Sequence, residues 1–72
     1  MNKKLYRSKM VLHGDTNATV AAALGISPQR NSAKVNGTHG ADYTQQEILT
    51  LKLRWGLSAE EVDAIFFANA VS

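Results

Sequence analysis

A chain of 72 residues forms one domain, and a domain of this size buries only about 60% of its unfolded surface, which leaves little core to support a deep catalytic cleft. Its 44% apolar and 19% charged residues are typical of a globular protein and argue against disorder. There is no cysteine, and no apolar stretch approaches the roughly 20 residues that span a bilayer. We therefore expect a single cytoplasmic domain over residues 1–72, with no membrane anchor.

The net charge of +2 is distributed unevenly along the chain. Residues 1–36 carry six lysines and arginines and one aspartate, for a net charge of +5, whereas residues 37–72 carry two basic and five acidic residues, for −3. Such asymmetry informs about partners rather than about the fold. It predicts that the first half can meet a polyanion and the second half a basic protein surface.

Five helices with short polar connectors are predicted, over about residues 2–13, 17–24, 27–36, 44–55 and 58–70. The first ends at Gly14, and Thr16 or Asn17 caps the second. The pair Ser27-Pro28 opens the third, because Ser is a strong N-cap and Pro is tolerated at the first helical position. No alternating β-branched run is present, so the expected class is all-α.

Two capping boxes fix the starts of the last two helices. In each, a hydroxyl residue is followed three positions later by a glutamate: Thr44 with Glu47, and Ser58 with Glu61. Thr44 and Ser58 are therefore interpreted as caps and not as nucleophiles. The two histidines are isolated, with no second ligand at metal spacing, and no catalytic arrangement, cofactor motif or small-molecule site emerges. We expect a protein that acts by binding and is not an enzyme.

Residues 17–37 predict two short helices that meet across a tight turn. Ala21 is small, which lets the following helix pack directly over it, and Gly25 stands where the chain needs a left-handed conformation. The aliphatic Ile26 follows, and it closes the angle from inside together with Val20 and Leu24. A small residue, a glycine four positions later and then an aliphatic residue is the spacing of a helix-turn-helix.

These residues resemble the Cro and repressor helix-turn-helix domains of temperate phages. The resemblance covers nearly the whole chain: residues 14–16 (Gly-Asp-Thr), 24–27 (Leu-Gly-Ile-Ser), 36–37 (Asn-Gly), 56–62 and 64–67. It implies a compact, lambda-repressor-like bundle of five helices. Within the family, the chain is most similar to the small modulator-of-repression proteins of Gram-positive phages. That similarity implies a role in the lysis–lysogeny switch, with the phage's own repressor as a partner.

If the module binds DNA as these relatives do, the third helix enters the major groove. The residues expected to face the groove are Ser27, Gln29, Arg30, Ser32 and Ala33. Gln pairs with adenine and Arg with guanine, and the Ala methyl can touch a thymine methyl. Asn17 and the first N–H groups of the second helix would hold a phosphate, with further charge from Lys34 and from Lys3 or Lys4.

The sequence departs from the family pattern at Asn31. Relatives place an aliphatic or aromatic anchor at this position, and a buried unpaired amide costs about 1–3 kcal/mol. Asn31 must therefore find a partner, or the helix must sit differently. Because the groove-facing set also holds a single Arg, tight DNA binding by the protein alone is not favoured.

The fourth helix carries two apolar stripes. Ile48, Leu51 and Trp55 form the first, which is predicted to be core, and Leu49 and Leu53 form the second. Two interpretations stay open: the helix is buried on two sides, or the second stripe joins Phe67 in a partner surface. The acidic residues expected around that surface are Glu47, Glu60, Glu61 and Asp63. Two functions follow: an antirepressor that covers the DNA-binding face of the phage repressor, with assisted DNA contact, or a Cro-like repressor that binds operator DNA alone.

Overall fold

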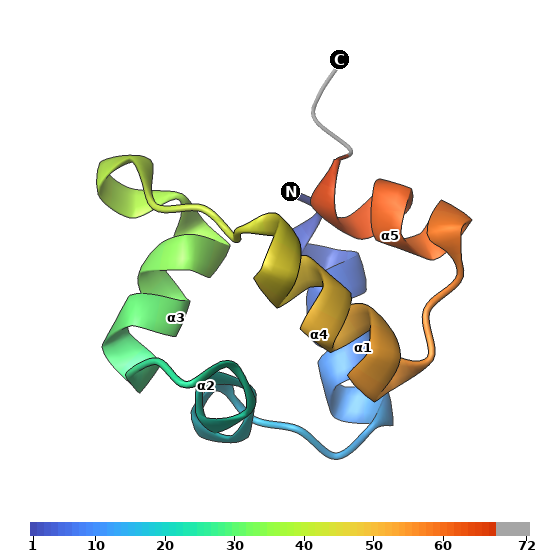
Figure 1. Ribbon diagram of the computed structural model, residues 1–72, viewed down its shortest axis with the longest axis horizontal. Helices are drawn as coiled ribbons and strands as arrows, with labels where there is room; N and C mark the ends of the chain where they lie inside the picture. Colours follow the sequence, from blue (N-terminus) through green and yellow to red (C-terminus); the bar gives the residue numbers. More distant parts are fainter. Residues whose placement is uncertain (68–72) are drawn as a thin grey trace.

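The computed structural model describes residues 1–67, except for the side chain of His39. This part of the chain folds into five α-helices and one short 3-10 helix, without a strand (Figure 1). The elements in chain order are α1 (Lys3–Leu12), α2 (Asn17–Leu24), α3 (Pro28–Asn36), η1 (Thr38–Gly40), α4 (Gln45–Trp55) and α5 (Ala59–Phe66). The predicted all-α class is confirmed. No helix of the described residues has the length and apolar character needed to cross a membrane.

Side-chain caps open all five α-helices. The two predicted capping boxes are present: the Thr44 and Ser58 hydroxyls accept from the backbone N–H groups of Glu47 and Glu61, whose carboxylates accept in return. For α2 the structure selects Thr16 over Asn17 as the cap. These caps satisfy N–H groups that have no partner within the helix, so they define where each helix begins.

Two predicted boundaries differ from the structure. Helix α5 ends at Phe66, with Phe67 as its C-cap, and so ends before the expected boundary near residue 70; residues 68–70 of the expected span lie outside the described part. The segment after α3, predicted as a plain loop, contains η1. Both differences concern helix ends, where sequence patterns are least informative.

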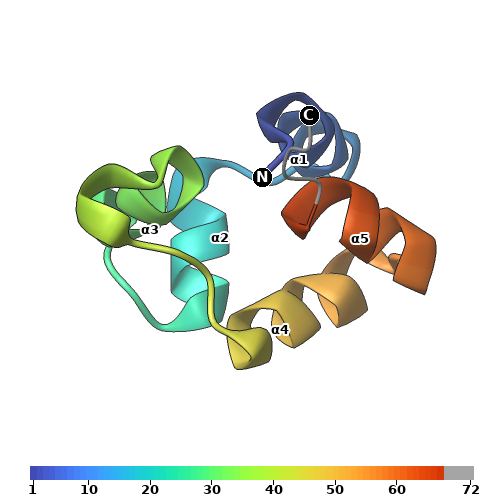
Figure 2. The same ribbon diagram turned by 90° about the horizontal axis from the view of Figure 1, so that it is seen from above.

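The helices form two groups (Figure 2). Helices α1, α4 and α5 surround the main core, and α2 and α3 pack against each other at one side of it. The largest fully buried side chains include Leu51, Ile65 and Val20, from α4, α5 and α2. The ring of Tyr6 on α1 meets Trp55 edge to face, with centroids 5.5 Å apart. Burial of these apolar side chains is the main stabilising contribution to the fold.

Helix α3 is an exception to this apolar packing. Its two buried residues are Asn31 and Lys34, and only Val35, which is partly buried, packs against the core. An amphipathic helix ordinarily turns an apolar stripe inward. Apart from Val35, the side chains that α3 packs against the body are therefore polar, and their contacts decide which residues of the helix can reach a ligand.

Candidate functional site

The α2–α3 pair has a tight connection. The chain leaves α2 through Gly25 in the left-handed conformation (φ 72°), and the backbone N–H of Ile26 donates to the carbonyl of Ala21 at 3.0 Å. Ala21 is fully buried beneath the pair, as its small size predicts. Ser27 then caps α3, because its hydroxyl accepts from the backbone N–H of Arg30 at 3.1 Å. The two helices are distinct, and α3 lies at the side of the molecule (Figure 1).

The expected groove-facing residues of α3 lie at or near the surface. Ser27, Gln29 and Arg30 are exposed, and Ser32 and Ala33 are half-buried. Arg30 makes no side-chain hydrogen bond or ion pair with the rest of the described chain, so its guanidinium is available to a ligand. This face therefore offers one cation and one amide, Gln29, as groups that can recognise bases.

Asn31 finds the partners that its burial demands. Its side-chain nitrogen, Nδ2, donates to Oδ1 of Asn17 at 2.9 Å, and its side-chain oxygen, Oδ1, accepts from the Tyr43 hydroxyl at 2.6 Å. The Tyr6 hydroxyl lies 3.0 Å from that of Tyr43 and 3.5 Å from the Asn31 amide nitrogen. Burial, followed by the contact with Tyr6, raises the pKa of Tyr43, so this phenol keeps its proton and donates to Asn31.

This network corrects the role expected of Asn17. Its amide nitrogen donates to the backbone carbonyl of Pro28 at 2.9 Å while its oxygen accepts from Asn31. The side chain thus ties the start of α2 to α3 instead of standing ready to hold a phosphate. The cause is Asn31 itself, because a buried amide at that position needs a polar neighbour.

Lys34 and Glu47 pair with each other, which changes the role expected of each. The Lys34 ammonium is 2.9 Å from a Glu47 carboxylate oxygen and 3.0 Å from the carbonyl of Asp42, and the two side chains are only 6% and 14% exposed. Burial raises the pKa of Glu47, but hydrogen bonds from the Thr44 backbone and from Lys34 outweigh it and lower that pKa overall. Lys34 is therefore not a free phosphate contact, and Glu47 does not belong to an exposed acidic surface.

The exposure of Leu49 and Leu53 decides between the two interpretations of α4. They are 46% and 75% exposed, so α4 is buried on one side only and the interpretation with two buried sides is wrong. The side chains that α4 buries are Ile48, Leu51 and Trp55, as predicted. The second stripe is thus an exposed apolar strip, which soluble proteins often use for binding.

Helix α5 has an exposed stripe of its own. Phe67 is 56% exposed, and Glu60 and Asp63 are exposed seven and four residues before it. Residues at this spacing share one face of a helix. Glu61, in contrast, forms an ion pair of 2.6 Å with Lys9 and caps the helix. Of the four predicted acidic residues, Glu60 and Asp63 are therefore the two whose side chains have no partner among residues 1–67, as far as these are described.

Asp15 is a buried acid that the sequence analysis missed. Its carboxylate accepts two hydrogen bonds from Arg54 (2.7 and 2.9 Å), one from the Trp55 indole N–H (2.7 Å) and one from Thr19 (2.9 Å). Hydrogen bonding from Arg54, above all, holds the pKa of this carboxyl far below its usual range. One signal was available, because a buried Trp needs an acceptor for its indole N–H.

The described residues contain no cluster of three or more His, Cys, Asp or Glu that could hold a metal ion. Comparison of the chain with protein-family models, with curated proteins and with solved structures gives no match. Similarity therefore assigns no family, and the resemblance to temperate-phage repressors stays a prediction. Three surface features of the molecule can meet a ligand or partner: the face of α3, the α4 strip and the α5 stripe.

Proposed function

We propose that the protein is a transcriptional regulator of a temperate phage's lysis–lysogeny switch that acts as an antirepressor. It covers the DNA-binding face of the phage repressor in the cytoplasm of the bacterial host, and its own contact with operator DNA is assisted by that partner. The observation that carries this proposal is the α5 stripe, on which the exposed Phe67 lies beside Glu60 and Asp63, two carboxylates that pair with no other described residue. The resemblance to modulator-of-repression proteins supplies the identity of the partner.

The charges that remain free support an acidic docking surface. Glu60 and Asp63 make no hydrogen bond or ion pair through their side chains with other described residues. A surface that reads DNA is rich in Lys and Arg, so two free carboxylates complement it and favour encounter with it. Phe67 adds an aromatic anchor, the residue class that is enriched at the centre of protein interfaces.

The α4 strip extends the apolar area available to a partner. Leu49 and Leu53 lie one helical turn apart, both exposed, on the side of α4 opposite Leu51. Leu53 is more exposed than Leu49, which places it first among the α4 residues expected to gain contacts on binding. A partner helix that packs along this strip would remove both side chains from water.

DNA binding by the protein alone is weakened by the burial of Lys34. Loss of that ammonium to the pair with Glu47 leaves Arg30 as the one cation on α3. Because phosphate contacts supply most of the affinity for DNA, a recognition helix with one cation needs help from elsewhere. The alternative, a Cro-like repressor that binds alone, rests on the exposed pair Gln29 and Arg30, which suit adenine and guanine.

The test measures binding of the purified phage repressor to this protein by calorimetry. The double variant Glu60→Lys, Asp63→Lys should weaken binding by at least tenfold, and Glu60→Gln, Asp63→Gln by less, because attraction becomes repulsion only in the former. Phe67→Ser should also weaken it. Leu12→Gln on α1, which removes an apolar side chain that is 71% exposed and does not belong to the α5 stripe, is the matched control.

A gel shift on operator DNA separates the two functions. The antirepressor predicts no tight shift by this protein alone at physiological salt, and a changed shift when the repressor is present. Unchanged repressor affinity in the charge-reversal variant would contradict the acidic docking surface. A tight, sequence-specific shift without the repressor would establish the Cro-like alternative instead.

A further inference from the structure

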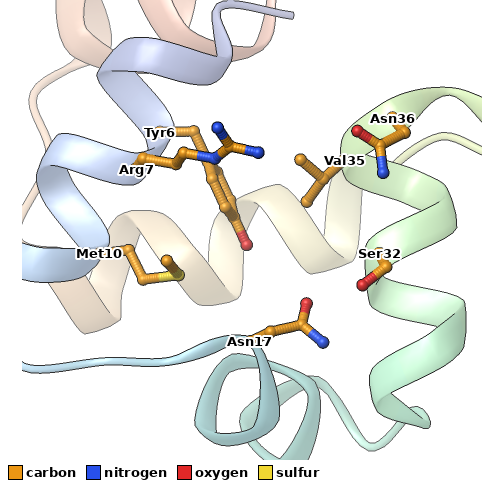
Figure 3. A pocket seen from close by; sticks show the side chains of 7 residues that line it. All are labelled: Tyr6, Arg7, Met10, Asn17, Ser32, Val35 and Asn36. Atoms are coloured by element: carbon orange, nitrogen blue, oxygen red, sulfur yellow. The ribbon is translucent and has the colours of Figure 1, made fainter.

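A groove of about 190 Å³ runs between α1 and α3 (Figure 3). Arg7 and Met10 line it from α1, and Ser32, Val35 and Asn36 line it from α3. Figure 3 shows the Arg7 guanidinium extended over this gap toward α3. The groove therefore places a cation opposite the same helix that carries Gln29 and Arg30.

A second groove adjoins the first. Val35 and Asn36 line both grooves, and Lys3 lines the second from α1. Lys3 and Arg7 are four residues apart, so they lie on the same flank of α1, separated by about 6 Å along its axis. The two cations thus follow one line along the seam between α1 and α3.

Arg7 differs from the paired cations of the molecule. Lys9, Lys34 and Arg54 each form an ion pair of 2.6 to 2.9 Å. The Arg7 side chain has no hydrogen bond or ion pair within the described residues, and neither have the side chains of Ser32 and Asn36 across the groove. Among the described residues, no hydrogen bond or ion pair therefore fixes the Arg7 guanidinium in place.

The Arg7 groove is positive as well as polar. None of the described residues that line it carries a carboxylate. Asp42 lines the adjoining groove at the loop after η1, where its carboxylate accepts from the backbone N–H of Tyr43 at 2.8 Å. An unpaired guanidinium beside neutral donors from Ser and Asn is the donor set that binds phosphate oxygens, because a guanidinium offers several N–H groups in one plane.

We infer that the seam between α1 and α3 binds the phosphodiester backbone of a DNA strand, with Arg7 as the principal contact and Lys3 as a second. This inference rests on the DNA contact within the proposed function and says where the missing phosphate contacts come from. A helix in the major groove lies between two strands, and α3 has Arg30 on one flank and the seam on the other. Phosphate binding in the seam would orient α3 without reading sequence.

The test uses the full protein alone and a 20-base-pair duplex of arbitrary sequence, because backbone contacts are independent of sequence. The dissociation constant is measured by fluorescence anisotropy at several salt concentrations from 50 mM upward. Each phosphate contact contributes about 0.9 to the slope of log K against log salt. Arg7→Gln should reduce this slope by about 1 and weaken binding several-fold at the lowest salt. Lys3→Gln should have the same effect to a smaller extent.

Lys52→Gln is the matched control, because Lys52 lies on α4 and lines neither groove. It changes the net charge equally and should leave the slope unchanged. As a second measurement, duplex should shift the NMR signals of Ser32, Asn36 and the Arg7 side chain. The inference is overturned if Arg7→Gln matches the parent protein, if Lys52→Gln loses as much, or if no duplex binds at 50 mM salt. Repressor binding is measured separately, so each of these outcomes leaves the antirepressor proposal standing.

Discussion

Helices α3 and α4 meet the rest of the molecule through opposite chemistries. Helix α4 turns Ile48, Leu51 and Trp55 inward, in the apolar manner expected of a small helical domain. Helix α3 turns Asn31 and Lys34 inward and is held by hydrogen bonds and an ion pair. Burial alone therefore does not identify an apolar core. A polar inner face also removes residues from the set that can reach a ligand.

The largest effect is expected at the centre of the apolar region. Leu51→Ala should lower the free energy of unfolding by about 3 kcal/mol, because it removes a fully buried side chain and leaves a cavity. Urea denaturation monitored by circular dichroism measures the loss. Leu53→Ala on the exposed side of the same helix is the control. A similar loss in both variants would contradict the assignment of the two stripes.

Asp15 gives the next largest effect and a dependence on pH. Asp15→Asn should cost about 2 kcal/mol at pH 7, because a buried acceptor loses its charge-assisted bonds. A pKa lowered on folding stabilises the protein above the ordinary value of 3.8, and this contribution is lost as the pH falls below it. Urea midpoints measured from pH 6 to pH 2 should therefore fall less steeply in Asp15→Asn than in the parent protein. Parallel slopes would argue against this role.

Asn31 tests the polar attachment of α3 directly. Asn31→Leu should destabilise the protein by about 1–2 kcal/mol, although an aliphatic residue is ordinary there in the resembled family. It removes the bonds that Asn31 makes with the Asn17 side-chain oxygen and with the Tyr43 hydroxyl. Adding Tyr43→Phe should cost less in this variant than in the parent protein, because the bond from the Tyr43 hydroxyl to Asn31 is already lost. A double-mutant cycle by urea denaturation measures this coupling. Strict additivity would mean that the two residues do not act together.

The smallest effect is expected on the α4 strip. Leu53→Gln should change the free energy of unfolding by less than about 0.5 kcal/mol, because Leu53 is 75% exposed. The same variant should weaken repressor binding, which calorimetry detects. Loss of stability without loss of binding would place Leu53 in the fold and not in the interface.

Local signals in the sequence predicted most of the fold. The hydroxyl–glutamate pairs at Thr44 and Ser58 fixed two helix starts, and Gly25 with the small Ala21 located the turn between α2 and α3. These features depend on a few neighbouring residues and on backbone conformation, so they can be recognised without knowledge of the packing. The interior side of α4 also followed from its helical spacing.

The candidate site was predicted less completely, because charge pairing depends on distant residues. Lys34 and Glu47 are 13 residues apart in sequence, and Lys9 and Glu61 are 52 apart. The first pair removes both of its residues from the predicted surfaces, and the second removes Glu61. Neither the uneven charge of the two halves nor the helical period reveals such pairs. The Arg7 groove was likewise hidden, since it exists only where α1 meets α3.

Local patterns in the sequence predicted the all-α class, the order of the helices, the caps of α3, α4 and α5 and the tight turn after α2, because each of these depends on a few residues along the chain. Which polar residues are buried and paired, and which remain exposed for partners, depends on how the helices pack. A buried amide or charge must be satisfied by whatever group the fold brings to it, and those groups come from other parts of the chain: Tyr43 for Asn31, and Trp55 for Asp15.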